Sequence, residues 1–305
     1  MVERPPLAPM RRPRGPSPEE IRRRRLIALG LVAGAVPLAL AVALFGWRSV
    51  RGHSAPTAPT IATAPRPLKI IFPEGFTRAQ MAERITAVDR IARRRRGVRP
   101  KLAPRAYLRL TASSDLPGRY ANDNRRRNLE GFLFPATYDF LPTTTSAQLV
   151  GFQLKAFRTN WGKVDLAYAR KKQLTPYDVL IIASMVEKET LAPDERPLVA
   201  AVIYNRLHAG IPLGIDATIR YGLDIPGTES LHESQLNSDN PYNTRKFSGL
   251  PPGPIANPGL ASMQAAAHPA KVNYLYFVRK PDKVHHFFTA SFREFQNYAN
   301  AHGFG

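Results

Sequence analysis

An uncharged run of 22 residues, from Leu26 to Trp47, constrains this chain more than any other feature of its sequence. At a rise of about 1.5 Å per residue, a helix of that length crosses a hydrocarbon core of roughly 30 Å. A helix buried in a soluble core would be the alternative, but the run has no polar face and no other segment is so long and apolar. The run therefore predicts one transmembrane helix over residues 26–47.

The residues before this run are basic, with eight arginines against three glutamates. The positive-inside rule then places a tail of residues 1–25 in the cytoplasm and the rest of the chain outside. A cleaved signal peptide is the alternative, although its apolar region normally has only about 7–15 residues. We expect a single-pass protein of the inner membrane, with its larger part in the periplasm.

The part of the chain after Trp47 is still strongly basic. Of 44 basic and 23 acidic residues in the whole chain, it keeps 36 and 20. Such a charge favours anionic partners, among which cell-wall polymers and lipid headgroups fit a periplasmic location. Nucleic acid is an unexpected partner there, because of location rather than charge. The absence of cysteine excludes disulfides and cysteine-based metal or redox sites.

A linker and one folded domain follow the predicted membrane helix. Residues 48–66 are rich in Pro, Ala, Thr and Ser, which is typical of a partly extended linker. Over residues 67–305, short strand patterns alternate with helical ones, so we expect an α+β domain. A short strand leads into a helix that Thr77 and Gln80 start with a capping box. Near the end, residues 273–279 and 284–290 alternate as the two strands of a hairpin.

Two helices in the middle of this domain are well marked. Thr175 is suited to cap the first, and the helix should run to about Leu191. Asp194 is suited to cap the second, which should end before Gly210. A further helix is expected over residues 259–270, and a capping box of Ser291 and Glu294 should start the last one.

The first of these helices ends in "ASMVEKET", which holds two glutamates. Glu187 and Glu189 are two residues apart, so on a helix they point about 200° apart and cannot act as a paired acid and base. Glu189 continues the apolar stripe of Val179, Ile182 and Val186. Desolvation there would raise its pKa, as a general acid requires. A solvated or salt-bridged glutamate at a helix end is the alternative.

Polar and aromatic residues elsewhere suggest a surface for sugars. Glu130 precedes an aromatic segment, which could form core or line a sugar groove. The turn-rich segment around Tyr242, Asn243 and Thr244 carries hydroxyl and amide groups of the kind that bind sugars, although a purely structural turn explains it equally well. His285 and His286 are adjacent, so on a strand they face opposite ways. No metal-binding pattern accompanies them, and we expect no metal site.

Taken in order, seven motifs resemble the endolytic murein transglycosylases of the YceG-like family. The motifs are "LEGFLFPATY", "ASMVEKET", "ERPLVAAVIYNRL", "DATIRYG", "PYNTRKFSGLPPGPIANPG", "AAAHPAKVNYLYFV" and "HHFF". They cover about residues 67–295. The resemblance implies a lytic transglycosylase that cleaves MurNAc–GlcNAc β-1,4 bonds in nascent peptidoglycan strands, leaves 1,6-anhydroMurNAc ends and terminates strand elongation. It implies no cofactor, and peptidoglycan synthases become candidate partners.

The resemblance also implies site residues. The second acid of "EKET", Glu189, matches the family's catalytic glutamate. Other motif positions give candidates for substrate binding: Asn205, Asp216, Tyr221, Tyr242, Asn243, Thr244 and His286.

The chain departs from the family pattern in two places. Only 19 residues separate Trp47 from Pro67, too few for the usual LysM-like module. Gly214 and Ile215 stand where the family usually has a polar pair, so substrate contacts there are in doubt.

Two other functions stay open: a non-catalytic scaffold that binds peptidoglycan or a divisome partner, and a hydrolase. The runs Arg93–Arg96 and Arg125–Arg127 are either solvated surface or a docking site for an anionic polymer or membrane.

Overall fold

The computed structural model describes residues 19, 66–113, 120 and 126–303. The predicted cytoplasmic tail, transmembrane helix and linker lie outside these residues, apart from Glu19 and Arg66, and they stay predictions. Among the described residues, no helix has both the length and the apolar character that crossing a membrane requires.

Helices dominate the folded part, with four short strands in two pairs, which confirms the predicted α+β class. In chain order the elements are β1 (Leu68–Ile71), α2 (Arg78–Arg96), α3 (Pro104–Ala112), β2 (Thr137–Phe140), α4 (Ser146–Trp161), α5 (Ala167–Lys171), α6 (Pro176–Glu189), the 3₁₀ turn η1 (Pro193–Glu195), α7 (Arg196–Ala209), α8 (Asp216–Gly222), α9 (Glu233–Leu236), α10 (Leu260–Ala267), β3 (Tyr276–Arg279), β4 (His286–Thr289) and α11 (Phe292–Ala301).

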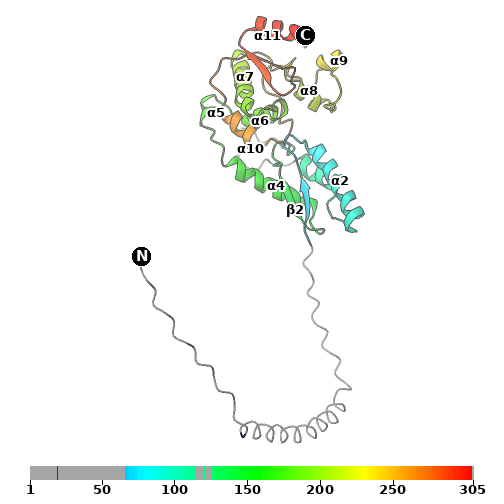
Figure 1. Ribbon diagram of the computed structural model, residues 1–305. Coiled ribbons are helices and arrows are strands. Elements are labelled where there is room, and N and C mark those ends of the chain that lie inside the picture. The colour runs from blue at the N-terminus through cyan, green and yellow to red at the C-terminus, as the bar shows by residue number, and fades with distance from the viewer. Residues whose placement is uncertain (1–18, 20–65, 114–119, 121–125, 304–305) are drawn as a thin grey trace, which may run out of the picture. The chain divides into compact units, whose positions relative to one another are not determined.

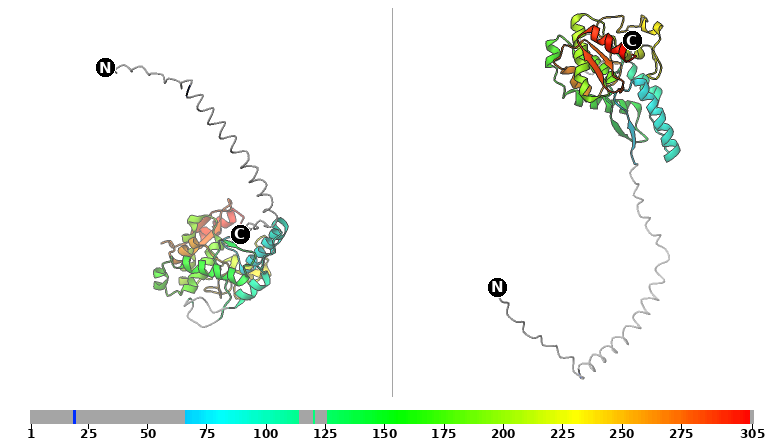
Figure 2. Two further views of the ribbon diagram at one scale, coloured as in Figure 1. Left: turned by 90° about the horizontal axis from the view of Figure 1, so that it is seen from below. Right: turned by 45° about the horizontal axis from the view of Figure 1, so that its top comes forward.

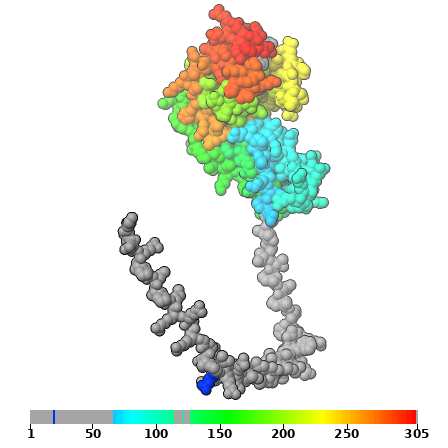
Figure 3. Space-filling view, in the orientation of Figure 1, coloured from blue at the N-terminus to red at the C-terminus, as the bar shows by residue number. Residues whose placement is uncertain are grey.

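The two strand pairs lie at opposite ends of the domain (Figure 1). Strands β1 and β2 pair antiparallel beside α2, and Leu68 lies opposite Phe140. Strands β3 and β4 form the predicted hairpin, with Arg279 opposite His286, and α11 packs against it (Figure 2). The chain thus progresses from the cyan end of the domain to the red end in the space-filling view (Figure 3).

Helix α6 forms the centre of the core between these ends. Its residues from Val179 to Val186 are all buried, as expected for a helix that is apolar on nearly every face. It packs against α10, α7 and α8. The aromatic segment after Glu130 also belongs to the core, where the Phe132 ring lies 5.0 Å from that of Phe157. A helix this enclosed gives a fixed position to any side chain at its end.

Local capping signals place most helix starts correctly. Thr77 and Thr175 both form capping boxes, with Gln80 and Asp178 respectively. At the last helix only half of the predicted box forms. The Ser291 hydroxyl accepts the N–H of Glu294, whereas the Glu294 carboxylate accepts the hydroxyl of Thr289.

Three predicted helix boundaries need correction. The helix predicted over residues 259–270 is α10, which ends at Ala267 because His268, the residue before Pro269, is not helical. Helix α6 ends at Glu189, two residues before Leu191, because Thr190 is extended and its hydroxyl donates to the carbonyl of Val186. Helix α7 begins at Arg196 rather than just after Asp194, because a 3₁₀ turn occupies Pro193–Glu195. Its other end is as predicted, with Gly210 left-handed at a φ of 67°.

Candidate active site

Glu189 is the last residue of α6, and its side chain is half-buried. The predicted divergence of the two glutamates is confirmed, since each contacts a different element. The carboxylate of Glu187 accepts the backbone N–H of Gly259 at 2.9 Å. The carboxyl of Glu189 instead meets the backbone N–H of Ala217, in the first turn of α8. One carboxyl therefore stabilises a loop, and the other stays available for chemistry.

Burial is the main influence on the proton affinity of Glu189 and raises its pKa to about 7. The nearby guanidinium of Arg279 on β3 acts the other way and favours the ionised form. Asp216 raises the pKa, whereas Lys188 and the N–H of Ala217 lower it. The carboxyl can consequently hold or release a proton near neutral pH.

A second buried carboxyl, Glu130, lies in the loop between α3 and β2, and only 2% of its surface is exposed. Its two oxygens accept hydrogen bonds from three groups. The backbone N–H of Arg78 lies 3.1 and 3.2 Å from them, the amide of Asn257 donates at 2.6 Å, and the hydroxyl of Tyr221 donates at 3.2 Å. Burial raises the pKa of Glu130 to about 7 as well, against the effect of these donors.

A cavity of about 570 Å³ opens beside the carboxyl of Glu130, whereas Glu189 is not itself among the residues that line it. Its volume falls within the range of roughly 300–1,000 Å³ that is typical of ligand pockets. Glu130 lines the cavity, as do Lys188 and Ala217, which flank Glu189. The rest of the lining is mixed polar and apolar: Thr77, Arg78, Ala79, Gln80, Glu83, Leu108, Arg220, Tyr221, Asp224, Ile225, Pro226, Gly227 and Ile255. The space can therefore hold a polar ligand, and two residues of its wall, Lys188 and Ala217, adjoin Glu189.

Three of the predicted substrate-binding residues lie near this cavity. Tyr221 lines it, and the ring of Tyr242 lies 5.1 Å from that of Tyr221. Asp216, at the first position of α8, accepts a hydrogen bond from Arg245 at 2.7 Å and stays partly exposed near Glu189. These three remain candidates for contacting a substrate.

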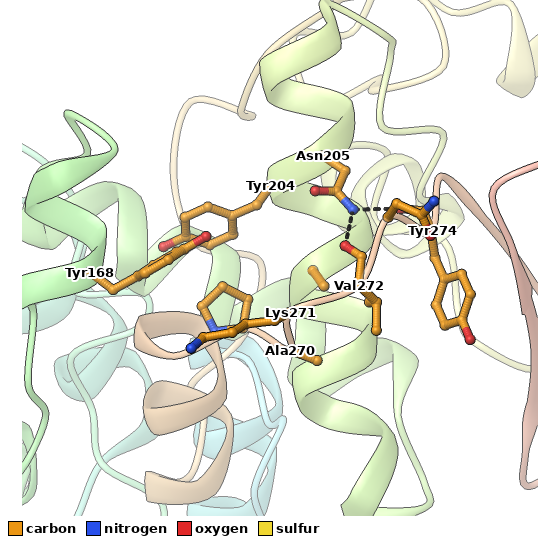
Figure 4. A pocket seen from close by; sticks show the side chains of 10 residues that line it. Tyr168, Tyr204, Asn205, Ala270, Lys271, Val272 and Tyr274 are labelled. Carbon is orange, nitrogen blue, oxygen red and sulfur yellow. Dashed lines mark hydrogen bonds between the residues drawn. The ribbon is translucent and has the colours of Figure 1, made fainter.

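Asn205 lies at a different place, on α7. Its amide nitrogen donates to the carbonyls of Val272 at 3.0 Å and Tyr274 at 2.8 Å (Figure 4). A second cavity, of about 580 Å³, lies here, with Tyr168 and Tyr204 among its lining residues. The Asn205 amide thus holds the chain before β3, and it is not among the residues that line the cavity beside Glu189.

Asn243 and Thr244 are buried and bind backbone groups. The amide of Asn243 donates to the carbonyls of Leu236 and Ser238. The hydroxyl of Thr244 accepts the N–H of Ile215 at 3.0 Å. Both side chains shape the loop that follows α9, and the structure brings neither to the cavity surface.

His286 is buried, whereas its neighbour His285 is partly exposed, so the two face different surroundings as their alternation on a strand requires. Nδ1 of His286 lies 2.6 Å from one carboxylate oxygen of Glu195, and its backbone N–H donates to the other at 2.8 Å. This pair joins the β3–β4 hairpin to η1. No cluster of three or more potential metal ligands occurs among the described residues.

Two functionally placed residues carry no local sequence signal. Arg279 is one of several cations in the hairpin, and only the strand register brings it toward Glu189. Glu195 looks like an ordinary first-turn acid in the sequence, yet its partner is 91 residues away. Glu195 takes the N-cap position of α7 but makes no capping hydrogen bond with its side chain, and no sequence signal reveals this.

The sequence itself matches the YceG-like family over residues 53–301. The chain belongs to the YceG-like family. This confirms the resemblance that the seven motifs carry. A solved structure of a Listeria monocytogenes protein described as yceG-like shares the fold of this YceG-like chain, with a TM-score of 0.62, 30% identity and 76% coverage of each chain.

Two curated relatives are each called endolytic murein transglycosylase. The Bacillus subtilis (strain 168) protein is 38% identical to this YceG-like chain over 159 residues, which cover 52% of the chain and 44% of that protein. The Streptococcus pneumoniae (strain R6) protein is 34% identical over 244 residues, covering 74% of the chain and 42% of that protein. The chain thus matches less than half the length of these relatives.

The raised pKa of Glu189 predicts a pH-dependent stability. A carboxyl whose pKa is higher in the folded state stabilises the fold at pH values below its unfolded pKa of 4.5, and this stabilisation is lost as pH rises through about 7. Glu189→Gln should therefore be more stable than wild type at pH 8, with the advantage shrinking toward pH 5. Thermal unfolding at several pH values tests this, and Glu229→Gln, at an exposed glutamate, is the control. A pH-independent difference would contradict the assigned environment.

Proposed function

We propose that this chain is a membrane-anchored lytic transglycosylase that cleaves MurNAc–GlcNAc β-1,4 bonds within peptidoglycan strands. The observation that carries the proposal is the Glu189 carboxyl, which is partly exposed, adjoins two residues of the cavity wall, and has its pKa raised by burial to about 7. A general acid must hold its proton near neutral pH and still reach its substrate. The name of the two curated relatives supports murein as the substrate.

The raised pKa alone does not choose between Glu189 and Glu130, because both lie near 7. Their hydrogen bonds differ. Donors from Arg78, Asn257 and Tyr221 already occupy both oxygens of Glu130, and its surface is almost fully covered. Glu189 meets one backbone N–H and keeps part of its surface open. We therefore assign the proton transfer to Glu189.

The reaction then needs one carboxyl group. Protonated Glu189 gives its proton to the glycosidic oxygen as the bond from C1 of MurNAc to that oxygen breaks. The C6 hydroxyl of the same MurNAc attacks C1, and its proton passes to the Glu189 carboxylate. The products are a free GlcNAc hydroxyl and a 1,6-anhydroMurNAc end. Water is not consumed, and Glu189 ends protonated as it began.

An intramolecular nucleophile explains why a second carboxylate is unnecessary. A glycoside hydrolase of the usual kind positions two carboxyl groups around the bond, one of them to activate water or to attack C1. A well-oriented internal hydroxyl reaches effective concentrations of up to about 10⁵–10⁸ M. Between the two proton transfers Glu189 is ionised, and Arg279 and the N–H of Ala217 both favour that form.

The membrane location forms part of the proposal. Residues 26–47 would anchor the chain in the inner membrane with the domain in the periplasm, where newly made glycan strands are present. Cleavage within such strands would terminate their elongation, and peptidoglycan synthases are candidate partners. A cysteine-accessibility assay in whole cells tests the orientation, because the chain has no native cysteine. A cysteine introduced after residue 66 should react with a membrane-impermeant reagent, and one before residue 26 should not.

Mass spectrometry of products from purified glycan strands tests the activity. We expect fragments with 1,6-anhydro ends, which are one water lighter than fragments with reducing ends. Strand binding by wild type without any release of fragments would instead support the scaffold function. Release of reducing ends would support a hydrolase.

A further inference from the structure

The carboxyl of Glu130 is buried in the wall of the cavity near Glu189, although the proposed reaction does not use this carboxyl. Burying an ionisable group costs several kcal/mol unless other groups compensate. Here donors from three separate segments converge on it: Arg78 of α2, Tyr221 of α8 and Asn257 of the loop before α10. These donors are 52, 91 and 127 residues away in sequence. The carboxyl therefore joins parts of the fold that local structure does not connect.

Of the three donors, Tyr221 is the one that lies on α8, the helix whose Ala217 N–H meets Glu189. It lies four residues after Ala217 on α8, so the two share one face of that helix, and both line the cavity. The N–H of Ala217 meets the Glu189 carboxyl at one end of α8, while the Tyr221 hydroxyl meets Glu130 at 3.2 Å near the other. Helix α8 has seven residues and also packs on α6. So short a helix depends on such contacts for its exact position.

We propose that Glu130 is a positioning residue that acts through Tyr221: it holds α8 so that the Ala217 N–H and Asp216 stay beside Glu189. This inference rests on the proposed function of Glu189. The bond from Arg245 to Asp216 at 2.7 Å holds the start of α8, and the bond from Tyr221 to Glu130 holds its end. The charged groups that face Glu189 are then Lys188 from α6, Asp216 from α8 and Arg279 from β3.

Tyr221→Phe tests this link with the smallest change, because it removes one hydroxyl and leaves Glu130 in place. We expect kcat/KM on glycan strands to fall about tenfold, as for loss of one hydrogen bond to a charged group. Retreat of α8 takes away both Asp216, which raises the pKa of Glu189, and the Ala217 N–H, which lowers it, and Asp216 has the larger effect, so the pKa of Glu189 should fall. The alkaline limb of the pH profile should consequently move to lower pH. A general loss of folded protein would lower activity without moving that limb.

A double-mutant cycle separates action through Tyr221 from independent action. Glu130→Gln should lose at least as much activity as Tyr221→Phe, and the double variant should lose little more than Glu130→Gln alone. Tyr138→Phe is the matched control, because it removes a tyrosine hydroxyl that also makes a part-buried hydrogen bond, to the carbonyl of Phe134 at 2.7 Å. It should keep wild-type activity. The proposal would be overturned if the fold-losses in activity of the two single variants multiplied in the double variant. Full activity of Tyr221→Phe would overturn it as well.

Amide hydrogen exchange of residues 216–222 gives a readout that needs no activity. Exchange across α8 should speed up in both Tyr221→Phe and Glu130→Gln, and it should stay at the wild-type rate in Tyr138→Phe. Unchanged exchange in both variants would contradict the positioning role whether or not the wild type is active. If wild type released no fragments while α8 exchange still rose, the proposed function would fail and the Glu130–Tyr221–α8 link would stand.

Discussion

Glu189→Gln is expected to release anhydro-ended fragments roughly 10²–10⁴-fold more slowly than wild type, the range for loss of a general acid. Glutamine keeps the size of the side chain and the contact with the N–H of Ala217, but it has no proton to give. Strand binding should persist, since the cavity lining is unchanged. Fragment release over time, measured by mass spectrometry with the variant in excess, can detect so slow a rate.

Glu187→Gln is the matched control for this prediction. It changes the same functional group two residues earlier on the same helix, and the glutamine oxygen can still accept the N–H of Gly259. Its activity should stay within a few-fold of wild type. Retained activity in Glu189→Gln together with loss in Glu187→Gln would mean that the acid has been assigned to the wrong face of α6.

Glu195→Gln is expected to lower the free energy of unfolding by about 2–4 kcal/mol, the largest effect on stability that we predict. The two oxygens of Glu195 each accept one N–H of His286, at 2.8 and 2.6 Å, in a site where both side chains are buried. Glutamine has one oxygen, so one of those N–H groups would face an amide NH₂ instead. Urea unfolding at pH 7 measures the difference.

The same hairpin supplies a contrasting pair for control. Asp282 and His285 also contact each other at 2.9 Å, but both side chains are about half exposed. Asp282→Asn should have a much smaller effect on stability, because water can replace the lost contact. Equal losses in the free energy of unfolding for Asp282→Asn and Glu195→Gln would show that burial does not increase the contribution of the Glu195–His286 contact to stability.

Sequence patterns predict those parts of this domain that depend on neighbouring residues. The capping boxes of Thr77 and Thr175 and the left-handed Gly210 follow from local hydrogen bonds, and all three are confirmed. The divergence of Glu187 from Glu189 follows from helix geometry alone. The choice of Glu189 over other acids came from its apolar surroundings and from the family motif, and it stays a prediction.

Side-chain chemistry was a weaker guide to the rest of the site. The family motif makes Asn205 a candidate, and the amide of Asn243 is of a kind that binds sugars, but amides also bind backbone carbonyls, and in the structure both do so. Glu130 and Arg279 act through partners that lie far away in sequence or across a strand register. Only the assembled fold specifies such pairs, so no local pattern could have selected them.

Cleavage of glycan strands in H₂¹⁸O tests the central claim most directly. The original reducing ends are first converted to alditols, so that any new end comes from the reaction. Because the MurNAc C6 hydroxyl attacks C1 and water takes no part, we predict 1,6-anhydro ends that carry no ¹⁸O. New reducing ends with ¹⁸O at C1 would contradict the account, since they would show that water and not the C6 hydroxyl completes the reaction that Glu189 begins.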